Sequence, residues 1–88
     1  MSHSNLSPDK LIIYTRVDCH LCDEAKAEIR ARLGEIEIEE IDVDSDPALA
    51  ERFGEEVPVG FVGSEKAFKY RADIRRLRRL LKNARRGG

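Results

Sequence analysis

The chain has 88 residues, of which 41% are hydrophobic and 38% are charged, and its formal net charge is −1. This length fits one domain with a small core, and the composition is ordinary for a globular domain with a heavily charged surface. The sequence has no apolar run near the roughly 18 residues of a membrane-spanning helix, and its polar start lacks the apolar segment of a secretory signal. We therefore expect a cytoplasmic protein, in a compartment where thiols are kept reduced, with no membrane partner.

The small net charge hides an asymmetry along the chain. Acidic residues dominate residues 35–56, whereas basic residues dominate residues 75–86. The basic segment lacks interleaved aromatic residues, and its leucines are needed for a core, so we expect a solvated helix face and no nucleic-acid partner. A docking surface for an acidic partner is the alternative interpretation.

Three elements are predicted in the first half of the chain. The run KLIIYT (10–15) is short, apolar and rich in β-branched and aromatic residues, which predicts a buried strand. Residues 20–33 carry apolar side chains at helical spacing, and Gly34 follows as a helix C-cap. Residues 35–43 alternate isoleucine or valine with acids, which predicts a strand with one face in solvent, although Glu39–Glu40 interrupts the alternation.

A second helix is predicted within residues 44–54. Ser45 or Asp46 is suited to the N-cap, Pro47 to the first helical position, and Gly54 to the end of the helix.

The last part of the chain predicts a hairpin and a final helix. The apolar run 57–62 is typical of a strand, the pair 63–64 is a turn, and residues 66–70 form the returning strand. An apolar stripe over residues 74–81 then predicts a helix that is capped near Asp73.

The predicted order is β-α-β-α-β-β-α, an α/β fold. Early strands that alternate with helices imply parallel pairing through right-handed crossovers, and the late hairpin adds antiparallel strands to give a mixed sheet. We expect a leader at residues 1–9, one domain at residues 10–82, and a frayed basic tail at residues 83–88.

The chemistry of the chain centres on its two cysteines, Cys19 and Cys22, in the segment YTRVDCHLCDEAKAEI. Cys19 lies where a strand ends and a helix begins. The helix N-terminus stabilises a thiolate there, so the pKa of this thiol is expected to fall, and the thiolate is the nucleophile. Cys22 follows three residues later, within reach of a mixed disulfide at Cys19. The spacing therefore indicates a redox pair in which Cys19 attacks and Cys22 resolves.

Other uses of the cysteine pair stay open. Structural zinc needs four protein ligands, and only His3 and His20 could join the cysteines, so no metal site is expected within one chain. A cluster shared between two chains and an inert pair of core residues are the remaining alternatives.

Pro58 is the second feature of interest, because proline cannot donate a hydrogen bond to a sheet and stands here at the start of a strand. A cis peptide bond would explain its position, and an ordinary trans proline that opens an edge strand is the alternative. If the bond is cis, Val57 could offer its backbone groups to an extended substrate.

The segments LIIYTRVDCHLC, EIDVDSDPALAERFG and EVPVGFVG resemble the short glutaredoxin-like proteins of the thioredoxin/glutaredoxin superfamily, which occur mainly in bacteria. The resemblance covers about residues 10–82. It implies a thioredoxin-like fold, with a mixed four-stranded sheet flanked by helices, a nucleophilic Cys19, a resolving Cys22 and a cis Pro58.

The chain departs from typical glutaredoxins in the segments that bind glutathione. Glu56 stands where they have a threonine, and no Gly-Gly pair follows the hairpin. The residues between the cysteines are His20 and Leu21, where typical glutaredoxins have Pro-Tyr. We therefore expect no required cofactor, with either glutathione or a reductase as the electron donor.

The sequence thus predicts a monomeric thiol–disulfide oxidoreductase of the dithiol glutaredoxin type that reduces disulfides of proteins or small thiols. An iron–sulfur carrier that shares a cluster through Cys19 and a redox-inert docking domain are the rival functions. The residues expected at the substrate, besides the catalytic Cys19 and Cys22, are Arg16, His20, Val57 and Pro58.

Overall fold

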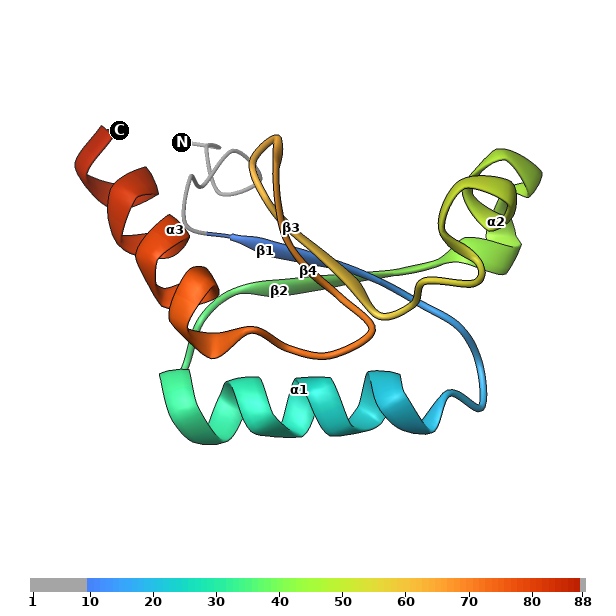
Figure 1. The fold of residues 1–88 in the computed structure, drawn as a ribbon, viewed down its shortest axis with the longest axis horizontal. Helices are drawn as coiled ribbons and strands as arrows, with labels where there is room; N and C mark the ends of the chain where they lie inside the picture. The colour runs from blue at the N-terminus through green and yellow to red at the C-terminus, as the bar shows by residue number, and fades with distance from the viewer. Residues whose placement is uncertain (1–9, 88) are drawn as a thin grey trace.

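The computed structural model describes residues 10–87, with side chains described for residues 10–84. Three α-helices and four strands follow one another in the predicted order (Figure 1). The elements are β1 (Leu11–Thr15), α1 (His20–Leu33), β2 (Ile38–Asp42), the 3₁₀ turn η2 (Val43–Ser45), α2 (Pro47–Phe53), β3 (Val59–Val62), β4 (Glu65–Lys69) and α3 (Ile74–Gly87). The expected leader, residues 1–9, lies outside the described residues.

The four strands form one mixed sheet in the order β2-β1-β3-β4. β1 pairs with β2 in parallel, because α1 returns the chain to the same end of the sheet, and β1–β3 and β3–β4 pair antiparallel. The predicted mixed four-stranded sheet with flanking helices is confirmed.

Each face of the sheet carries its own hydrophobic cluster. The cluster under α1 and α3 is mainly aliphatic and includes Leu11, Ile13, Ile29 and Leu77, all fully buried. The cluster under α2 is built from Val43, Phe53 and Val59, with Tyr14 and Phe61 packed against it. Figure 1 shows the same division, with α1 and α3 on one side of the sheet and α2 on the other.

α1 begins and ends at the predicted residues. Cys22, Ala25 and Ile29 are its buried residues, and they recur at spacings of three and four, so they form one stripe that faces the sheet. Gly34 ends the helix with a positive φ of 75°, a conformation that glycine adopts at little cost.

β2 is shorter than the strand predicted for residues 35–43. Ile38 and Ile41 are three positions apart, so they point to opposite faces of the sheet, and the prediction of one fully solvated face was wrong. Ile38 packs against the cluster under α1 and α3. Val43, expected in the strand, begins η2 and lies buried under α2.

α2 is capped by Asp46, whose carboxylate accepts a hydrogen bond from the backbone N–H of Ala48 (2.9 Å). Pro47 takes the first helical position, as predicted. Gly54 ends this helix in a right-handed conformation, so a positive φ does not explain why a glycine stands there.

The hairpin β3–β4 turns at Gly63, which has a positive φ of 62°. β3 begins at Val59, two residues later than predicted, and β4 begins at Glu65, one residue earlier. Gly60 faces the ring of Phe68, and a side chain there would collide with that ring, so this close approach requires a glycine.

α3 begins with the predicted cap, because Asp73 Oδ1 accepts a hydrogen bond from the backbone N–H of Arg76 (3.1 Å). The helix continues to Gly87, beyond its predicted apolar stripe, and the fraying expected for the basic tail from residue 83 stays a prediction. Alanine and arginine have high helix propensity, which favours continuation of the helix over this stretch.

Candidate active site

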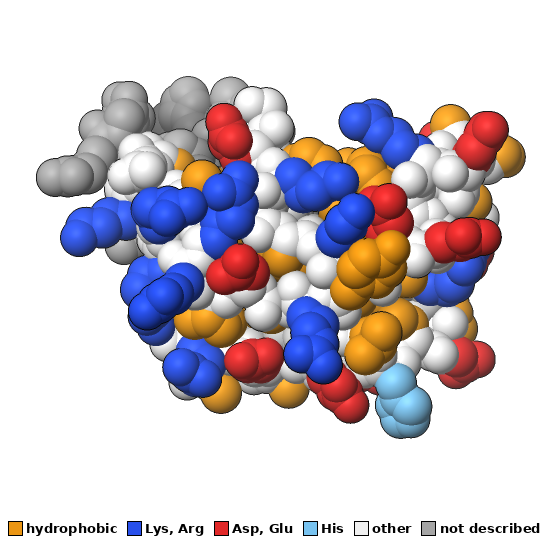
Figure 2. All heavy atoms as spheres, viewed as in Figure 1, with side chains coloured by type: hydrophobic (Ala, Val, Ile, Leu, Met, Phe, Trp, Pro, Cys, Tyr) orange, Lys and Arg blue, Asp and Glu red, His pale blue; other side chains and the backbone are white. Residues whose placement is uncertain are grey.

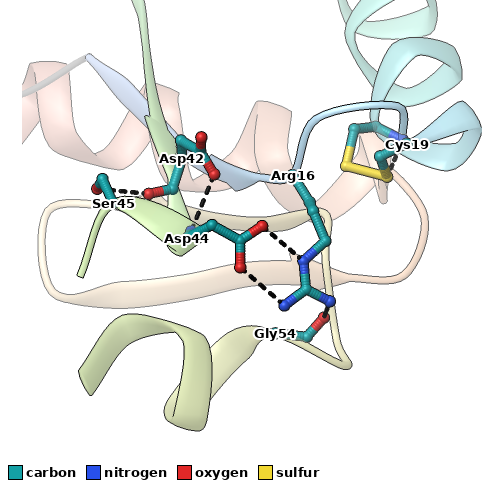
Figure 3. Close-up of polar contacts among 7 residues, drawn as sticks. Arg16, Cys19, Asp42, Asp44, Ser45 and Gly54 are labelled. Carbon is teal, nitrogen blue, oxygen red and sulfur yellow. Dashed lines mark hydrogen bonds and ion pairs between the residues drawn. A yellow bond between two sulfur atoms is a disulfide. The ribbon is translucent and has the colours of Figure 1, made fainter. Parts of the chain in front are cut away.

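The two cysteines are joined by a disulfide at the start of α1, with their Cα atoms 5.3 Å apart. Cys19 is the N-cap of α1, in an extended conformation, and its Sγ accepts a hydrogen bond from the backbone N–H of Cys22 (3.1 Å). Figure 3 shows the disulfide at the point where the loop after β1 enters the helix. The predicted placement of the pair at a strand-to-helix junction is confirmed.

The two sulfurs differ in exposure. Cys22 belongs to the buried stripe of α1 and is 2% exposed, whereas Cys19 is partly exposed. The difference follows from helix geometry, because an N-cap residue lies outside the helical stripe and the residue three positions later lies within it. Cys19 is therefore the more accessible member of the pair.

The loop before Cys19 turns sharply at Asp18, which has a positive φ of 60°. Aspartate is one of the few non-glycine residues that tolerate this left-handed conformation. The turn lets β1 end at Thr15 and α1 start at His20 with only four residues between them.

The Val57–Pro58 peptide bond is cis, and the Pro58 side chain is fully buried. Val59 pairs with Tyr14 and with Lys69, so Pro58 lies at the end of the sheet where β1 runs into the cysteine loop. The backbone N–H of Tyr70 donates to the carbonyl oxygen of Pro58 (2.9 Å). The segments around residues 16–22, 57–58 and 70 therefore meet at one end of the sheet.

Arg16 lies in the cysteine loop, but its guanidinium turns toward Asp44 and Gly54 and not toward the disulfide (Figure 3). Nε and Nη2 donate to the two carboxylate oxygens of Asp44 (3.0 and 3.1 Å), and Nη1 donates to the carbonyl oxygen of Gly54 (3.0 Å). This fork ties the loop after β1 to η2 and to the end of α2.

The pairing shifts both ionisation equilibria toward the charged forms. The hydrogen bond from Arg16 holds the pKa of Asp44 below its ordinary value, and the same bond raises the pKa of Arg16. These contacts explain why residue 54 is a glycine. A side chain at Gly54 would approach both the Ala50 carbonyl and the Arg16 guanidinium.

His20 is the first residue of α1 and is exposed, and Val57 is partly buried against the aromatic cluster under α2. The structure thus places His20, Val57 and Pro58 at the same end of the sheet as the cysteines. That these residues and Arg16 contact a substrate stays a prediction.

Comparison with known proteins places this chain in a family. The model of the glutaredoxin-like domain (DUF836) matches residues 10–82. The chain belongs to this glutaredoxin-like family. No match was found among curated proteins.

Solved structures similar to this glutaredoxin-like domain include two with about one third of identical residues. The X-ray structure of the structural genomics target XcR50 from X. campestris is 33% identical, with a TM-score of 0.67, over 83% of this chain and 96% of that one. The solution structure of glutaredoxin from Brucella melitensis is 34% identical, with a TM-score of 0.54, over 89% and 84% of the two chains. A buckwheat glutaredoxin, solved as a complex with glutathione, shares 18% identity and the fold, with a TM-score of 0.61 over 92% and 86%.

Sequence reasoning missed the surface that this glutaredoxin-like domain presents beside its cysteines. Leu21 and Tyr70 are each 46% exposed, and both line a groove of about 260 Å³ between α1 and the segment that follows β4. Tyr70 has a positive φ of 71°, which is uncommon for a bulky residue. The absence of a Gly-Gly pair after the hairpin was a sequence signal that could have drawn attention to this segment.

Two features are absent from the part of the chain that the structure describes. No three His, Cys, Asp or Glu side chains of residues 10–87 lie close enough together to hold a metal ion. Within the same part of the chain, no helix has the length and apolar character needed to cross a membrane.

Proposed function

We propose that this protein is a dithiol thiol–disulfide oxidoreductase. In the reduced protein, the Cys19 thiolate attacks a substrate disulfide, forms a mixed disulfide and expels one substrate thiolate, which takes up a proton. The Cys22 thiolate then attacks the Cys19 sulfur and expels the second substrate thiolate. The substrate gains two electrons and two protons, and the protein is left with the Cys19–Cys22 disulfide.

The observation that carries this proposal is the geometry of the cysteine pair. The sulfurs bond to each other across the first turn of α1, so the oxidised product of the reaction fits the fold. The backbone N–H that Cys22 directs at the Cys19 sulfur, together with the helix N-terminus, would stabilise a Cys19 thiolate in the reduced protein. The partly exposed sulfur can meet a substrate, and the buried one is in place to resolve the adduct.

We propose that the substrates are disulfides of proteins or of small thiols, and that a thiol reductant regenerates the dithiol. Glutathione and a reductase are both proposed donors, and the glutathione complex of the buckwheat glutaredoxin supports testing glutathione first. We further propose that the protein works as a cytoplasmic monomer, where the reducing environment favours the dithiol.

A single-turnover experiment tests the proposal without a physiological donor. The fully reduced protein is mixed with excess bis(2-hydroxyethyl) disulfide, and both released thiol and protein mass are followed. We expect two thiols released per chain, a product with the Cys19–Cys22 disulfide, and a rate at about pH 7 at least about tenfold above that of free cysteine. A rate no faster than free cysteine would overturn the proposed function.

A further inference from the structure

A groove with many basic residues extends from the start of α1 along the line where α1 faces the chain from β4 into α3. Its first part lies between the exposed side chains of Leu21 and Tyr70 and is also lined by Glu24, Glu28 and Arg71. The next part, about 480 Å³, shares Arg71 and Ala72 with the first. A third part, about 350 Å³, continues from Arg32 to the far end of α1. We call these three parts together the seam.

Cations outnumber acids along the seam. The cations that line it are Arg32, Lys69, Arg71, Arg75, Arg78 and Lys82. The acids that line it are Glu24, Glu28 and Asp73. Figure 2 shows Lys and Arg side chains gathered over α3 and the turn that leads into it, and hydrophobic side chains exposed near the start of α1.

Two of the three acids in the seam are already engaged. Glu28 pairs with Arg32 (4.0 Å between Oε2 and Nη1), and Asp73 caps α3 through the backbone N–H of Arg76. Lys69 pairs with Glu56 outside the seam (3.8 Å between Nζ and Oε2).

The other four cations keep their charge available. Among residues 10–84, Arg71, Arg75, Arg78 and Lys82 form no ion pair with an acidic side chain. Arg78 donates to the carbonyl oxygen of Arg32 at the end of α1 (3.3 Å), which fixes its head group at the seam but leaves its positive charge without a carboxylate partner.

We propose that the seam selects disulfide substrates of one class, namely protein segments that carry an apolar residue beside the reacting cysteine and acidic residues after it. This inference rests on the proposed function and names the substrate class of the same site. Leu21 and Tyr70 lie at the end of the seam near the start of α1, where Cys19 is the N-cap, and the cationic part continues toward the other end of α1. A bound segment would therefore meet these two surfaces in that order.

The dimensions fit an extended peptide. Leu21 and Arg32 are eleven positions apart on α1, which corresponds to about 16 Å along the helix. An extended chain covers that distance with about five residues. Carboxylates within about five residues of the reacting cysteine would therefore reach the arginines.

The same surface fits other polyanions less well. The described residues of α3 expose no large hydrophobic side chain that could enter a bilayer, since the exposed ones are Val17, Leu21 and Tyr70. Tyr70 is the only exposed aromatic ring in the seam, whereas single-stranded nucleic acid is bound on a series of such rings.

The test compares two peptides, each with a leucine next to a cysteine that is disulfide-linked to 2-mercaptoethanol. One carries three glutamates within the next five residues, and the other carries glutamines at those positions. The fully reduced protein should reduce the glutamate peptide about tenfold faster at low ionic strength. The preference should disappear at about 1 M salt, where the Debye length falls to about 3 Å.

Charge-reversal variants test whether the arginines of the seam cause the preference for the glutamate peptide. The triple variant Arg71→Glu, Arg75→Glu, Arg78→Glu should lose the preference for the glutamate peptide and keep its rate with the glutamine peptide. Arg79→Glu is the matched control, because Arg79 is on the same helix but does not line the seam. The rate with bis(2-hydroxyethyl) disulfide should be unchanged in both variants, which also shows that they remain folded.

The outcomes separate this inference from the proposed function. If the protein reduces none of the three disulfides faster than free cysteine, the proposed function fails. If it reduces both peptides equally fast, or if Arg79→Glu acts as strongly as the triple variant, the seam does not select substrates. Equal peptide rates together with triple-variant-sensitive binding of a DNA oligonucleotide or of phosphatidylserine vesicles would assign the seam to those partners instead.

Discussion

Cys19 and Cys22 are three residues apart, yet they lie in two different regions of the molecule. Cys19 belongs to the loop that enters α1, where Asp18 turns the chain and Arg16 ties it to Asp44. Cys22 belongs to the aliphatic side of the sheet, in the same helical stripe as Ala25 and Ile29. A single helix start therefore divides the pair into an accessible sulfur and a protected one, and this division suits successive roles in disulfide exchange.

Removing the accessible sulfur should have the strongest effect on activity. Cys19→Ser should reduce the rate with bis(2-hydroxyethyl) disulfide to that of the buffer, because the remaining thiol at Cys22 is 2% exposed. Thiol release in the single-turnover assay measures this. A Cys19→Ser protein that still releases thiol at the wild-type rate would show that the nucleophile has been misassigned.

Removing the protected sulfur should have a different effect. Cys22→Ser should complete the first exchange, release one thiol per chain, and stop as a stable adduct at Cys19, since no second thiol is present to resolve it. Intact-protein mass spectrometry detects the adduct. Release of a second thiol at the normal rate would count against the resolving role of Cys22.

The reactivity of the two thiols should differ even in the unaltered reduced protein. Cys19 should be alkylated at least about tenfold faster than Cys22 at about pH 7, because it is partly exposed and lies at a helix N-terminus. Timed alkylation followed by peptide mapping measures both rates in one sample. Equal rates would remove the distinction on which the order of attack depends.

The ion pair between Arg16 and Asp44, which holds the cysteine loop, should contribute only slightly to stability. Because Arg16 lowers the pKa of Asp44 in the folded protein, the pair contributes stability fully above the unfolded pKa of about 4, and this contribution is lost as the pH falls through the folded pKa. Asp44→Asn should therefore be slightly less stable than the unaltered protein at about pH 7, and the two should converge in acid.

Urea unfolding over a pH series measures this difference. Glu39→Gln is a matched control, because Glu39 forms an ion pair with Lys10 near the start of β1, away from the cysteines. Asp44→Asn should also change the alkylation rate of Cys19, whereas Glu39→Gln should leave it unchanged. A stability difference for Asp44→Asn that grows toward low pH would contradict the assigned ion pair.

Local signals in the sequence predicted much of the fold. Gly34 and the Asp46–Pro47 pair define helix ends through short-range chemistry, and the end of α1 and the start of α2 follow directly from them. The bounds of β2 were harder to predict, because the acids that alternate with isoleucines in residues 35–43 do not show where pairing with β1 begins. The end of α3 was missed because helix propensity alone extends it beyond its apolar stripe.

The candidate site was predicted only in part, because some of its residues carry local sequence signals and others do not. The spacing of Cys19 and Cys22 indicates a redox pair. The position of Pro58 before a strand indicates a cis peptide bond. Arg16 was expected at the substrate, but its partner Asp44 lies 28 positions away, and no local pattern reveals such a pair. The exposed Tyr70 lies at the same end of the sheet as the cysteines because β4 pairs with β3. This pairing becomes visible only in three dimensions.

The measurement that tests the central claim most directly is a redox titration of the cysteine pair. The protein is equilibrated in glutathione buffers of graded potential, free thiols are trapped by alkylation, and the species are identified by mass spectrometry. We expect a reversible Cys19–Cys22 disulfide with a midpoint between about −120 and about −270 mV, the range of known dithiol oxidoreductases. A pair that stays reduced across the whole range would contradict it.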